Sequence, residues 1–385
     1  MSHPVLNAAS AALGVPLDYR GDLALLGGPR RCLLISRAEK SPRPDSPWLH
    51  ATLDAVRESH ARRETLVAGA GRIAYDAALW ASAECGDRAI VALASAPDAA
   101  DESQRIIPPQ SLLVWPRETP KDSAVAQTLR DRLMGELSDR VFAIHVRKTG
   151  NMAALAARFA ERGIEVVSFQ TSRPPAPSPV ISKGATVEGA TSTLSDATGW
   201  TFLTHFTREP GGAWPGEDYA DYVRWLCSGV SFAPRDAFAA LCRILKEKRL
   251  RACGRLMPGN TPMVCFTELH PTRTVPLRRW RRGLLRWTFT QYGLAIRKNV
   301  LLDLGARPVK YVTREVLDTG ATDDRRFMQI EKTEKYDWSA EAEWRVAGDI
   351  DLASVPIHEM LALVEFTHEA AYLSETFGVA SAVIP

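Results

Sequence analysis

Short apolar runs alternate with amphipathic stretches between Cys32 and about Phe169, and this alternation restricts the fold more than any other feature of the sequence. The apolar runs are Cys32–Ile35, Thr65–Ala68, Ala89–Ala92, Leu112–Val114, Val141–Val146 and Glu165–Phe169. Between them, apolar residues recur at helical spacing in Leu49–Ser59, Ala74–Ala83, Ala124–Leu137 and Met152–Arg162. Because this pattern is typical of βαβ units, it predicts a Rossmann-like α/β domain with five or six parallel strands.

The domain pattern ends in a segment of different composition. Residues 171–195 are rich in Pro, Ser, Thr and Gly and have no sustained period, which indicates a linker. Beyond it tryptophans become frequent and strands no longer alternate regularly with helices, which favours an α+β fold. Since 385 residues exceed what one core usually organises, we expect an N-terminal domain over 1–170, a linker over 171–198 and a C-terminal domain over 199–385.

Composition and charge indicate an ordinary globular protein, with 45% hydrophobic residues and a formal net charge of +3. The N-terminus has no charged-then-apolar leader, and no apolar run reaches membrane-spanning length. We therefore expect a soluble, cytoplasmic protein without a membrane partner. The six cysteines form no Cys-x-x-Cys pair, so we expect neither a disulfide framework nor a metal site.

The turn Gly69-Ala70-Gly71 follows a predicted strand and opens a predicted helix. Its backbone can approach a phosphate, and the amides at the helix start favour an anion. The alternative is that the glycines only permit a tight strand-to-helix turn.

Three segments together carry a family resemblance: Ser36-Arg37, AGAGRIAYDAALWASAECG at 68–86 and the stretch 130–169. They resemble the Rossmann-like superfamily that contains DNA-processing protein A and the LOG and lysine-decarboxylase-like proteins, often called SLOG. The resemblance implies one pocket for a nucleotide or nucleic acid. The residues it places there are Ser36, Arg37, Gly69, Gly71, Asp76, Arg130, Arg132, Thr149 and Gly150.

Each of these positions also has an ordinary structural interpretation. The arginines are then solvated helix-end charges, Asp76 an exposed helix residue and Thr149-Gly150 a helix-entry turn. The sequence lacks the Pro-Gly-Gly-x-Gly-Thr run that accompanies phosphoribohydrolase activity in the LOG branch. Ligand sensing is therefore favoured over hydrolysis at this pocket.

In the C-terminal half, Phe202-Leu203-Thr204-His205-Phe206-Thr207 places His205 and Thr207 two residues apart on a predicted strand. Residues at this spacing point to one face, so the two side chains could meet one ligand. The alternative is a core histidine whose ring bonds a backbone carbonyl.

Further segments follow in the order Ala237–Lys246, Thr261–Glu268, Tyr292–Ile296 and Glu341–Val346. This order resembles the ADP-ribosyltransferase-like domains of bacterial abortive-infection and DNA-targeting toxin families. The resemblance implies NAD as a substrate, with His205 on the ribose, Tyr292 stacked on nicotinamide and Glu343 stabilising the cationic transition state. It implies that Thr207 assists His205 and that Arg345 orients Glu343 or the pyrophosphate.

Two other acids compete with Glu343 for that role. Glu341 alternates with Glu343 on the predicted strand, and Glu268 follows another predicted strand. Strand packing alone is a further explanation for the alternation of Trp344 and Arg345.

The segment 278–287 packs five arginines and two tryptophans into ten residues. Guanidinium groups neutralise phosphates and indole rings stack on bases, so Arg278, Arg279, Arg281 and Arg282 are candidate nucleic-acid contacts. The alternative is a solvated face, or arginines packed against tryptophan rings.

Three functions remain open from the sequence. The favoured one is a SLOG-like sensor of a nucleotide or nucleic acid fused to a domain that transfers ADP-ribose from NAD or hydrolyses it; a role in bacterial phage defence follows from the resemblance only. The second is a non-catalytic DNA- or RNA-binding protein. The third is a nucleotide-processing enzyme with its site in the N-terminal domain, the C-terminal domain forming a homodimer.

Overall fold

The computed structural model describes residues 3–35, 42–97, 106–169, 199–228, 234–254, 257, 260–281, 286–319, 322–333 and 336–384, with the backbone alone at 281, 286, 322 and 323. The expected linker at 171–198 lies outside these ranges. The chain forms two compact units. Among the described residues, the first contains 3–169 and 211–228, and the second contains 199–210 and 234–384.

A seven-stranded sheet forms the centre of the first unit. Its strand order is β1 (Leu17–Arg20), β5 (Leu112–Pro116), β4 (Ala89–Ala92), β3 (Thr65–Gly69), β2 (Arg30–Ile35), β6 (Arg140–Ile144) and β7 (Glu165–Phe169). The six strands from β5 to β7 are parallel, and β1 is antiparallel to β5. The predicted α/β fold class is confirmed, and the six predicted apolar runs match these strands to within two residues at each end.

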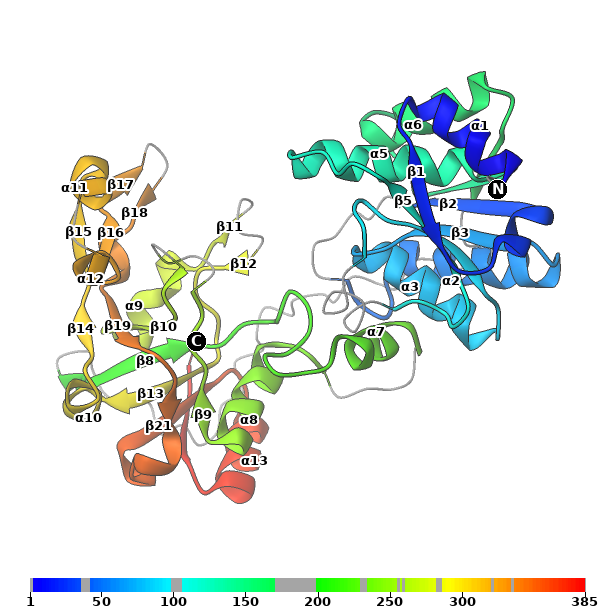
Figure 1. Cartoon of the computed structure of the whole chain (residues 1–385). Helices are drawn as coiled ribbons and strands as arrows, with labels where there is room; N and C mark the ends of the chain where they lie inside the picture. The colour runs from blue at the N-terminus through cyan, green and yellow to red at the C-terminus, as the bar shows by residue number, and fades with distance from the viewer. Residues whose placement is uncertain are drawn as a thin grey trace. The chain divides into compact units, whose positions relative to one another are not determined.

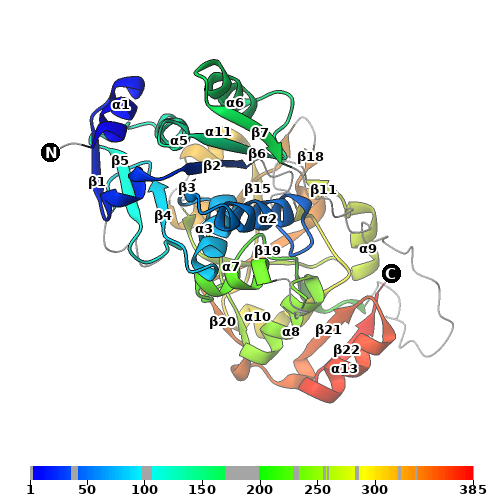
Figure 2. The same cartoon turned by 90° about the vertical axis from the view of Figure 1, so that its right-hand side faces the viewer.

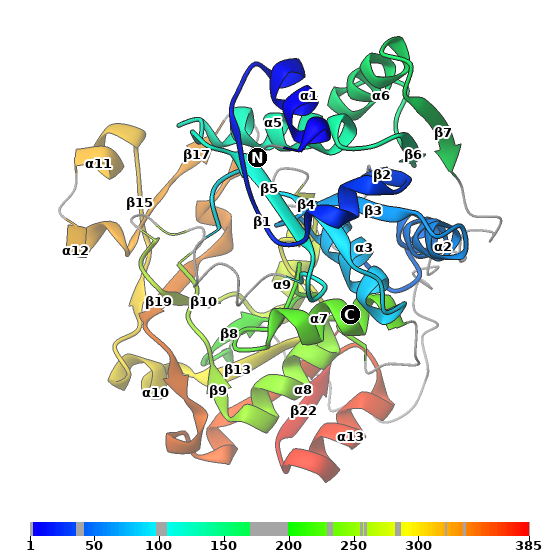
Figure 3. The same cartoon turned by 45° about the vertical axis from the view of Figure 1, so that its right-hand side comes forward.

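Helices cover both faces of this sheet (Figures 1 and 3). One face carries α1 (Pro4–Leu13), α5 (Ser123–Glu136) and α6 (Asn151–Glu161), and the other carries α2 (Pro47–Ala61) and α3 (Ile73–Glu84). A short 3-10 helix, η1 (Leu23–Gly27), precedes β2. The chain moves outward from β2 through β3 and β4 to β5, and then crosses to β6 on the other side of β2. This reversal places a topological switch point between β2 and β6.

Helix α7 (Tyr219–Ser228) belongs to the first unit, although its residues fall within the range expected for the C-terminal domain. Its apolar face packs against α3, and Tyr222, Val223, Leu226 and Cys227 are buried in the core of the first unit. The expected domain boundary at 199 therefore does not hold for residues 211–228, because the apolar face of α7 is buried in the core of the first unit.

The second unit has its own seven-stranded sheet and a mixed α+β fold. The order is β14 (Arg307–Pro308), β19 (Glu343–Ala347), β10 (Met263–Thr267), β8 (Phe202–Phe206), β13 (Gly293–Arg297), β21 (Met360–Val364) and β22 (Ala380–Val383). Neighbouring strands are antiparallel except β21 and β22. Helices α8 (Ala237–Glu247) and α13 (Thr367–Phe377) contribute to the core on one face, and Figure 2 shows α13 beside β21 and β22.

Short elements surround this second sheet. The strand pairs are β9 (Arg249–Leu250) with β20 (Ile350–Asp351), β11 (Trp280–Arg281) with β12 (Arg286–Trp287), β15 (Lys310–Val312) with β16 (Met328–Ile330), and β17 (Lys332–Thr333) with β18 (Tyr336–Asp337). The short α-helices are α9 (Pro271–Thr274), α10 (Lys298–Asp303), α11 (Arg314–Thr319) and α12 (Thr322–Arg325). The 3-10 turns are η4 (Val275–Leu277), η5 (Ser339–Glu341), η6 (Leu352–Ser354) and η7 (Ile357–Glu359). Within the described ranges, no helix combines the length and apolar character that crossing a bilayer requires.

The packing of α5 on α6 depends on a glycine. A Cβ atom added at Gly135 would lie 1.9 Å from Cζ of Phe159, whose side chain is fully buried. The aromatic ring thus occupies the space that any other residue at position 135 would need.

We expect Gly135→Ala to lower the free energy of unfolding by about 1 kcal/mol, because overpacking costs about 1–3 kcal/mol and alanine regains roughly 1 kcal/mol of helix propensity. Urea unfolding measures the difference. Gly27→Ala is the control, since an added Cβ there meets no atom within 4 Å. A Gly135→Ala protein as stable as the wild type would contradict this packing.

Candidate functional site

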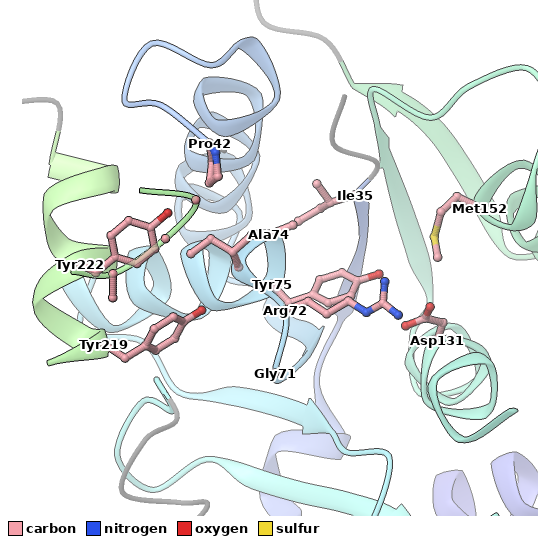
Figure 4. Close-up of a pocket in the computed structure, with 14 residues that line it drawn as sticks. Ile35, Pro42, Gly71, Arg72, Ala74, Tyr75, Asp131, Met152, Tyr219 and Tyr222 are labelled. Carbon is pink, nitrogen blue, oxygen red and sulfur yellow. The ribbon is translucent and has the colours of Figure 1, made fainter. Parts of the chain in front are cut away.

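A cavity of about 620 Å³ opens in the first unit at the carboxyl ends of its parallel strands. Its lining residues are Ile35, Pro42, Gly71, Arg72, Ile73, Ala74, Tyr75, Asp131, Met152, Gly211, Gly212, Ala213, Tyr219 and Tyr222. Ile35 ends β2, Gly71 follows β3, and Met152 lies in the first turn of α6 (Figure 4). The cavity therefore occupies the switch point, where open α/β sheets form their ligand crevice.

Asp76 fixes the glycine turn that borders the cavity. Gly71 has a left-handed backbone (φ +81°), and its N–H donates to Oδ1 of Asp76 at 3.2 Å. The hydroxyl of Tyr219, on α7, donates to Oδ2 of the same carboxylate at 2.6 Å. Asp76 is only 2% exposed. It therefore connects the glycine turn to α7. The ordinary structural interpretation, in which Asp76 is an exposed helix residue, is wrong.

Arg130 supports the same turn from α5. Its fully buried guanidinium donates to the carbonyl of Ala70 at 2.9 Å and to Oδ1 of Asp131 at 2.6 and 3.0 Å. A Cβ at Gly69 would lie 2.9 Å from Nε of Arg130. Gly69 is thus required for the close approach of this arginine, and Arg130 is a structural residue beneath the turn.

Two helices begin at the cavity without a side-chain cap. The N-cap of α3 is Arg72, whose side chain makes no capping hydrogen bond, and that of α6 is Gly150 (φ +107°), which has no side chain to cap with. The first N–H groups of a helix have no intrahelical acceptor, and the helix start carries a partial positive charge. Arg72 and Gly150 are exposed. This rim can therefore donate hydrogen bonds to an anion.

Polar groups also line the cavity wall. The Tyr75 hydroxyl is buried, with the residue 2% exposed, and has no hydrogen-bond partner among the described residues. Burial, and then the charge of Asp131, raise the pKa of this phenol, so the hydroxyl remains a donor. Figure 4 shows Tyr75, the Arg72 guanidinium and Asp131 pointing toward one another. A ligand here meets a donor, a cation and a carboxylate.

The opposite wall is aromatic and was missed from the sequence. Tyr219 and Tyr222 reach the cavity from α7 (Figure 4), and the Tyr222 ring stacks with Trp225 at 6.1 Å between centroids. The only sequence signal was the recurrence of aromatic residues at 219, 222 and 225. That spacing marks one helical face but does not say which surface the face covers.

The remaining residues predicted for this pocket have different outcomes. Ser36 and Arg37 lie outside the described residues, between the lining residues Ile35 and Pro42 in sequence. Thr149 is exposed beside the start of α6. Arg132 does not face the cavity, and this prediction is wrong. Its Nη2 lies 3.5 Å from the carbonyl oxygen of Ala12 in α1, because residues two apart on α5 point to different sides.

In the second unit, His205 is a half-buried histidine. Its Nδ1 donates to the carbonyl of Cys265 at 2.9 Å, and its ring contacts Phe266 edge-on at 5.9 Å between centroids. Burial lowers the pKa of His205 to about 4, so the ring is neutral at pH 7. This hydrogen bond to a backbone carbonyl is the one that the structural alternative in the sequence analysis expects.

The three predicted catalytic residues do not share one face of the second sheet. His205 pairs with Leu294, whereas its neighbour Thr204 pairs with Thr267, which pairs in turn with Glu343. Cross-strand partners share a face and successive residues alternate, so Glu343 lies on the face opposite His205. The expected convergence is therefore wrong, because strand register determines the face.

Tyr292 and Glu343 have separate partners. The Tyr292 hydroxyl lies 3.0 Å from Glu369 and 3.2 Å from Glu365. Arg345 binds both carboxylate oxygens of Glu343 at 2.9 and 3.0 Å. The same arginine, 1% exposed, also donates to the carbonyls of Arg326 and Met328, so it joins β19 to β16 as a structural residue.

The residue expected to assist His205 and the two acids that compete with Glu343 also have hydrogen-bond or ion-pair partners. Thr207 is buried and donates its hydroxyl to the carbonyl of Ala237 at 2.7 Å. Glu341 ends η5, outside the strand that was expected to hold it, and accepts from the Tyr336 hydroxyl at 2.6 Å. Glu268 pairs with Lys298 at 3.0 Å.

Two short strands of the arginine-tryptophan segment, β11 and β12, pair antiparallel. Trp280 and Trp287 are 49% and 42% exposed and contact each other edge-on across the two strands. Arg279 lies over the Tyr336 ring, 4.4 Å from its centroid, and Arg278 is half-buried. The Arg281 side chain and Arg282 lie outside the described residues. Arg279 is exposed and packs on a tyrosine ring, not on the tryptophan rings of the alternative interpretation.

Comparison with known proteins gives no family assignment: no family model and no curated protein matches the chain. Two solved structures are similar over 39% of this chain. One is the X-ray structure of DNA processing protein A from Streptococcus pneumoniae, at 19% identity and a TM-score of 0.31, over 53% of that chain. The other is DNA processing protein A from Helicobacter pylori, described for its single-stranded DNA binding mode, at 18% identity and 0.30, over 69% of that chain. The match spans about half the length of the pneumococcal protein.

We expect Asp76→Asn to reduce the free energy of unfolding by about 1–3 kcal/mol, because one amide group replaces a buried carboxylate that accepts from both Gly71 and Tyr219. Chemical unfolding measures this loss. Tyr219→Phe should cost less, since the Gly71 bond to Asp76 remains. Equal stability of Asp76→Asn and the wild type would exclude a supporting role for this carboxylate.

The lowered pKa of the half-buried His205 predicts a stability change in acid. Its pKa is about 4 in the folded chain and 6.5 ordinarily, so between these values the unfolded chain binds a proton that the folded chain does not. The free energy of unfolding therefore falls as the pH falls from 6.5 toward 4. His205→Gln should flatten this part of the profile in urea titrations, and the exposed His358→Gln should not. Identical profiles for the His205 variant and the wild type would contradict the prediction.

Proposed function

We propose that the first unit binds a nucleotide in the cavity at the switch point of its sheet. The observation that carries this proposal is the meeting of an uncapped helix start at Arg72 with the aromatic wall of Tyr219 and Tyr222 in one cavity of about 620 Å³. Small-molecule sites have volumes of about 300–1,000 Å³, so a mononucleotide is a suitable size.

Each part of a nucleotide has a matching surface. The phosphate lies at the start of α3, where backbone N–H groups and the Arg72 guanidinium offer charge-assisted hydrogen bonds. The base lies against Tyr219 or Tyr222, since aromatic rings stack on any base. Sugar hydroxyls lie between Tyr75 and Asp131, which offer a donor and an acceptor.

The proposal is binding rather than turnover. Among the described lining residues, Asp131 is the one with a carboxylate group. Arg130 already donates two hydrogen bonds to Oδ1 of this carboxylate. An ion-paired carboxylate is a weak general base. A sensing or anchoring role therefore fits this cavity better than hydrolysis.

Transfer of ADP-ribose from NAD is not part of the proposal. It was expected from His205, Tyr292 and Glu343, and the opposite orientation of His205 and Glu343 leaves no shared site for these two.

The test uses charge reversal at the rim. Arg72→Glu should weaken nucleotide binding roughly 10- to 100-fold, because a charged hydrogen bond contributes about 1.5–3 kcal/mol and 1.4 kcal/mol is about tenfold in affinity. The fold should persist, since Arg72 is exposed and an acidic residue suits a helix start. Calorimetry with AMP, ATP and GTP measures the affinities.

Arg158→Glu is the matched control, because it makes the same change of charge at an exposed site in the last turn of α6, away from the α6 start. Equal loss in both variants would indicate a general charge effect and refute the cavity site. Absence of nucleotide binding, together with tight and steeply salt-dependent binding of a short oligothymidylate, would favour a nucleic-acid ligand instead.

A further inference from the structure

Three side chains of different chemistry meet at the far ends of α2 and α3. His60 lies in the last turn of α2, Cys85 is the C-cap of α3, and Asp87 follows two residues later. One ligand atom from each lies within 4.8 Å of the others, and Nδ1 of His60 is 2.9 Å from Oδ2 of Asp87. Nothing in the nucleotide proposal uses this cluster.

The backbone holds Cys85 and Asp87 in a fixed turn. The N–H groups of Cys85, Gly86 and Asp87 donate to the carbonyls of Ala81, Ala83 and Ser82 at 3.1, 2.9 and 3.0 Å. Gly86 has the left-handed φ of +75° that closes such helix ends. Since α2 packs directly against α3, His60 faces this turn from a second rigid element. The three groups thus come from well-supported positions.

We propose that His60, Cys85 and Asp87 bind a divalent transition metal ion of the zinc class, with water completing the coordination. Imidazole nitrogen, thiolate sulfur and carboxylate oxygen are the ligands that zinc takes in proteins, and three protein ligands plus water form a common open site. On binding, the thiol releases its proton to solvent and the sulfur forms the bond to the metal.

The geometry requires only a small adjustment. Ligands about 2.0–2.3 Å from a tetrahedral zinc ion lie about 3.3–3.8 Å from one another, so the widest separation here closes by about 1 Å. His60 and Asp87 are partly exposed and can rotate by this amount. Arg57 is a positive charge near Cys85, and it is itself paired with Asp54 at 2.9 Å, which offsets its repulsion of a metal cation. Asp87 and the thiolate supply two negative charges for the cation.

The cluster lies at the opposite end of α3 from the cavity. Ile73, Ala74 and Tyr75 line the cavity at the start of this helix, whereas Cys85 caps its end. Twelve helical residues separate the two ends by about 18 Å. The metal proposal therefore stands or fails independently of nucleotide binding.

Cobalt is the spectroscopic probe for this site. The full chain, freed of metal by chelation, is titrated with CoCl₂ and then with ZnCl₂. We expect one equivalent of Co²⁺ to produce a thiolate-to-cobalt charge-transfer band, and Zn²⁺ to abolish it and to raise the thermal unfolding midpoint. Cys85→Ser should remove the band, and His60→Gln should weaken Co²⁺ binding at least about tenfold.

Cys253→Ser is the matched control, because Cys253 is an exposed thiol in the second unit. It should leave both the band and the thermal shift unchanged. Absence of a charge-transfer band in the wild type, or its persistence in a folded Cys85→Ser protein, would overturn the proposal. Loss of the band in Cys253→Ser would assign the metal to another cysteine and overturn it equally. Circular dichroism of each metal-free variant verifies the fold.

Discussion

The buried guanidinium of Arg130 is the interaction on which the candidate site depends. It lies beneath the glycine turn, where it neutralises Asp131 and satisfies the Ala70 carbonyl. A buried arginine is tolerated only when a carboxylate neutralises its charge and acceptors bind its N–H groups. The turn and α5 supply these partners, and the lack of a side chain at Gly69 leaves room for the guanidinium. These contacts connect the glycine turn at the cavity rim to α5.

A second buried charged residue, Asp76, connects the glycine turn to α7. Asp76 accepts hydrogen bonds from the glycine turn and from Tyr219, so the rim of the cavity and its aromatic wall share one carboxylate. Two hydrogen bonds to Asp76 therefore connect the position of the glycine turn to that of Tyr219. Under the proposed function, a ligand bound at the rim would stabilise the position of α7 through this link.

The sequence predicts the first unit well where the signal is local. Strands and helices were predicted because the hydrophobic period depends on nearby residues. Gly71 was predicted because it belongs to a recognisable turn, and Asp76 because a family resemblance places an acid on the following helix. The roles of Asp76 and Arg130 could not be predicted, since they depend on burial. Tyr219 and Tyr222 were missed because only tertiary packing brings α7 to α3, and His205 and Glu343 were wrongly combined because register, which no local pattern specifies, decides the face of a strand.

The return of the chain to the first unit also sets an order of assembly during synthesis. Strand β8 emerges from the ribosome before α7, yet its sheet neighbours β10 and β13 emerge only later. All residues of the aromatic wall are thus synthesised before the strands that pair with β8. The two units are consequently interleaved in translation, and neither can be separated from the other by a single cut of the gene.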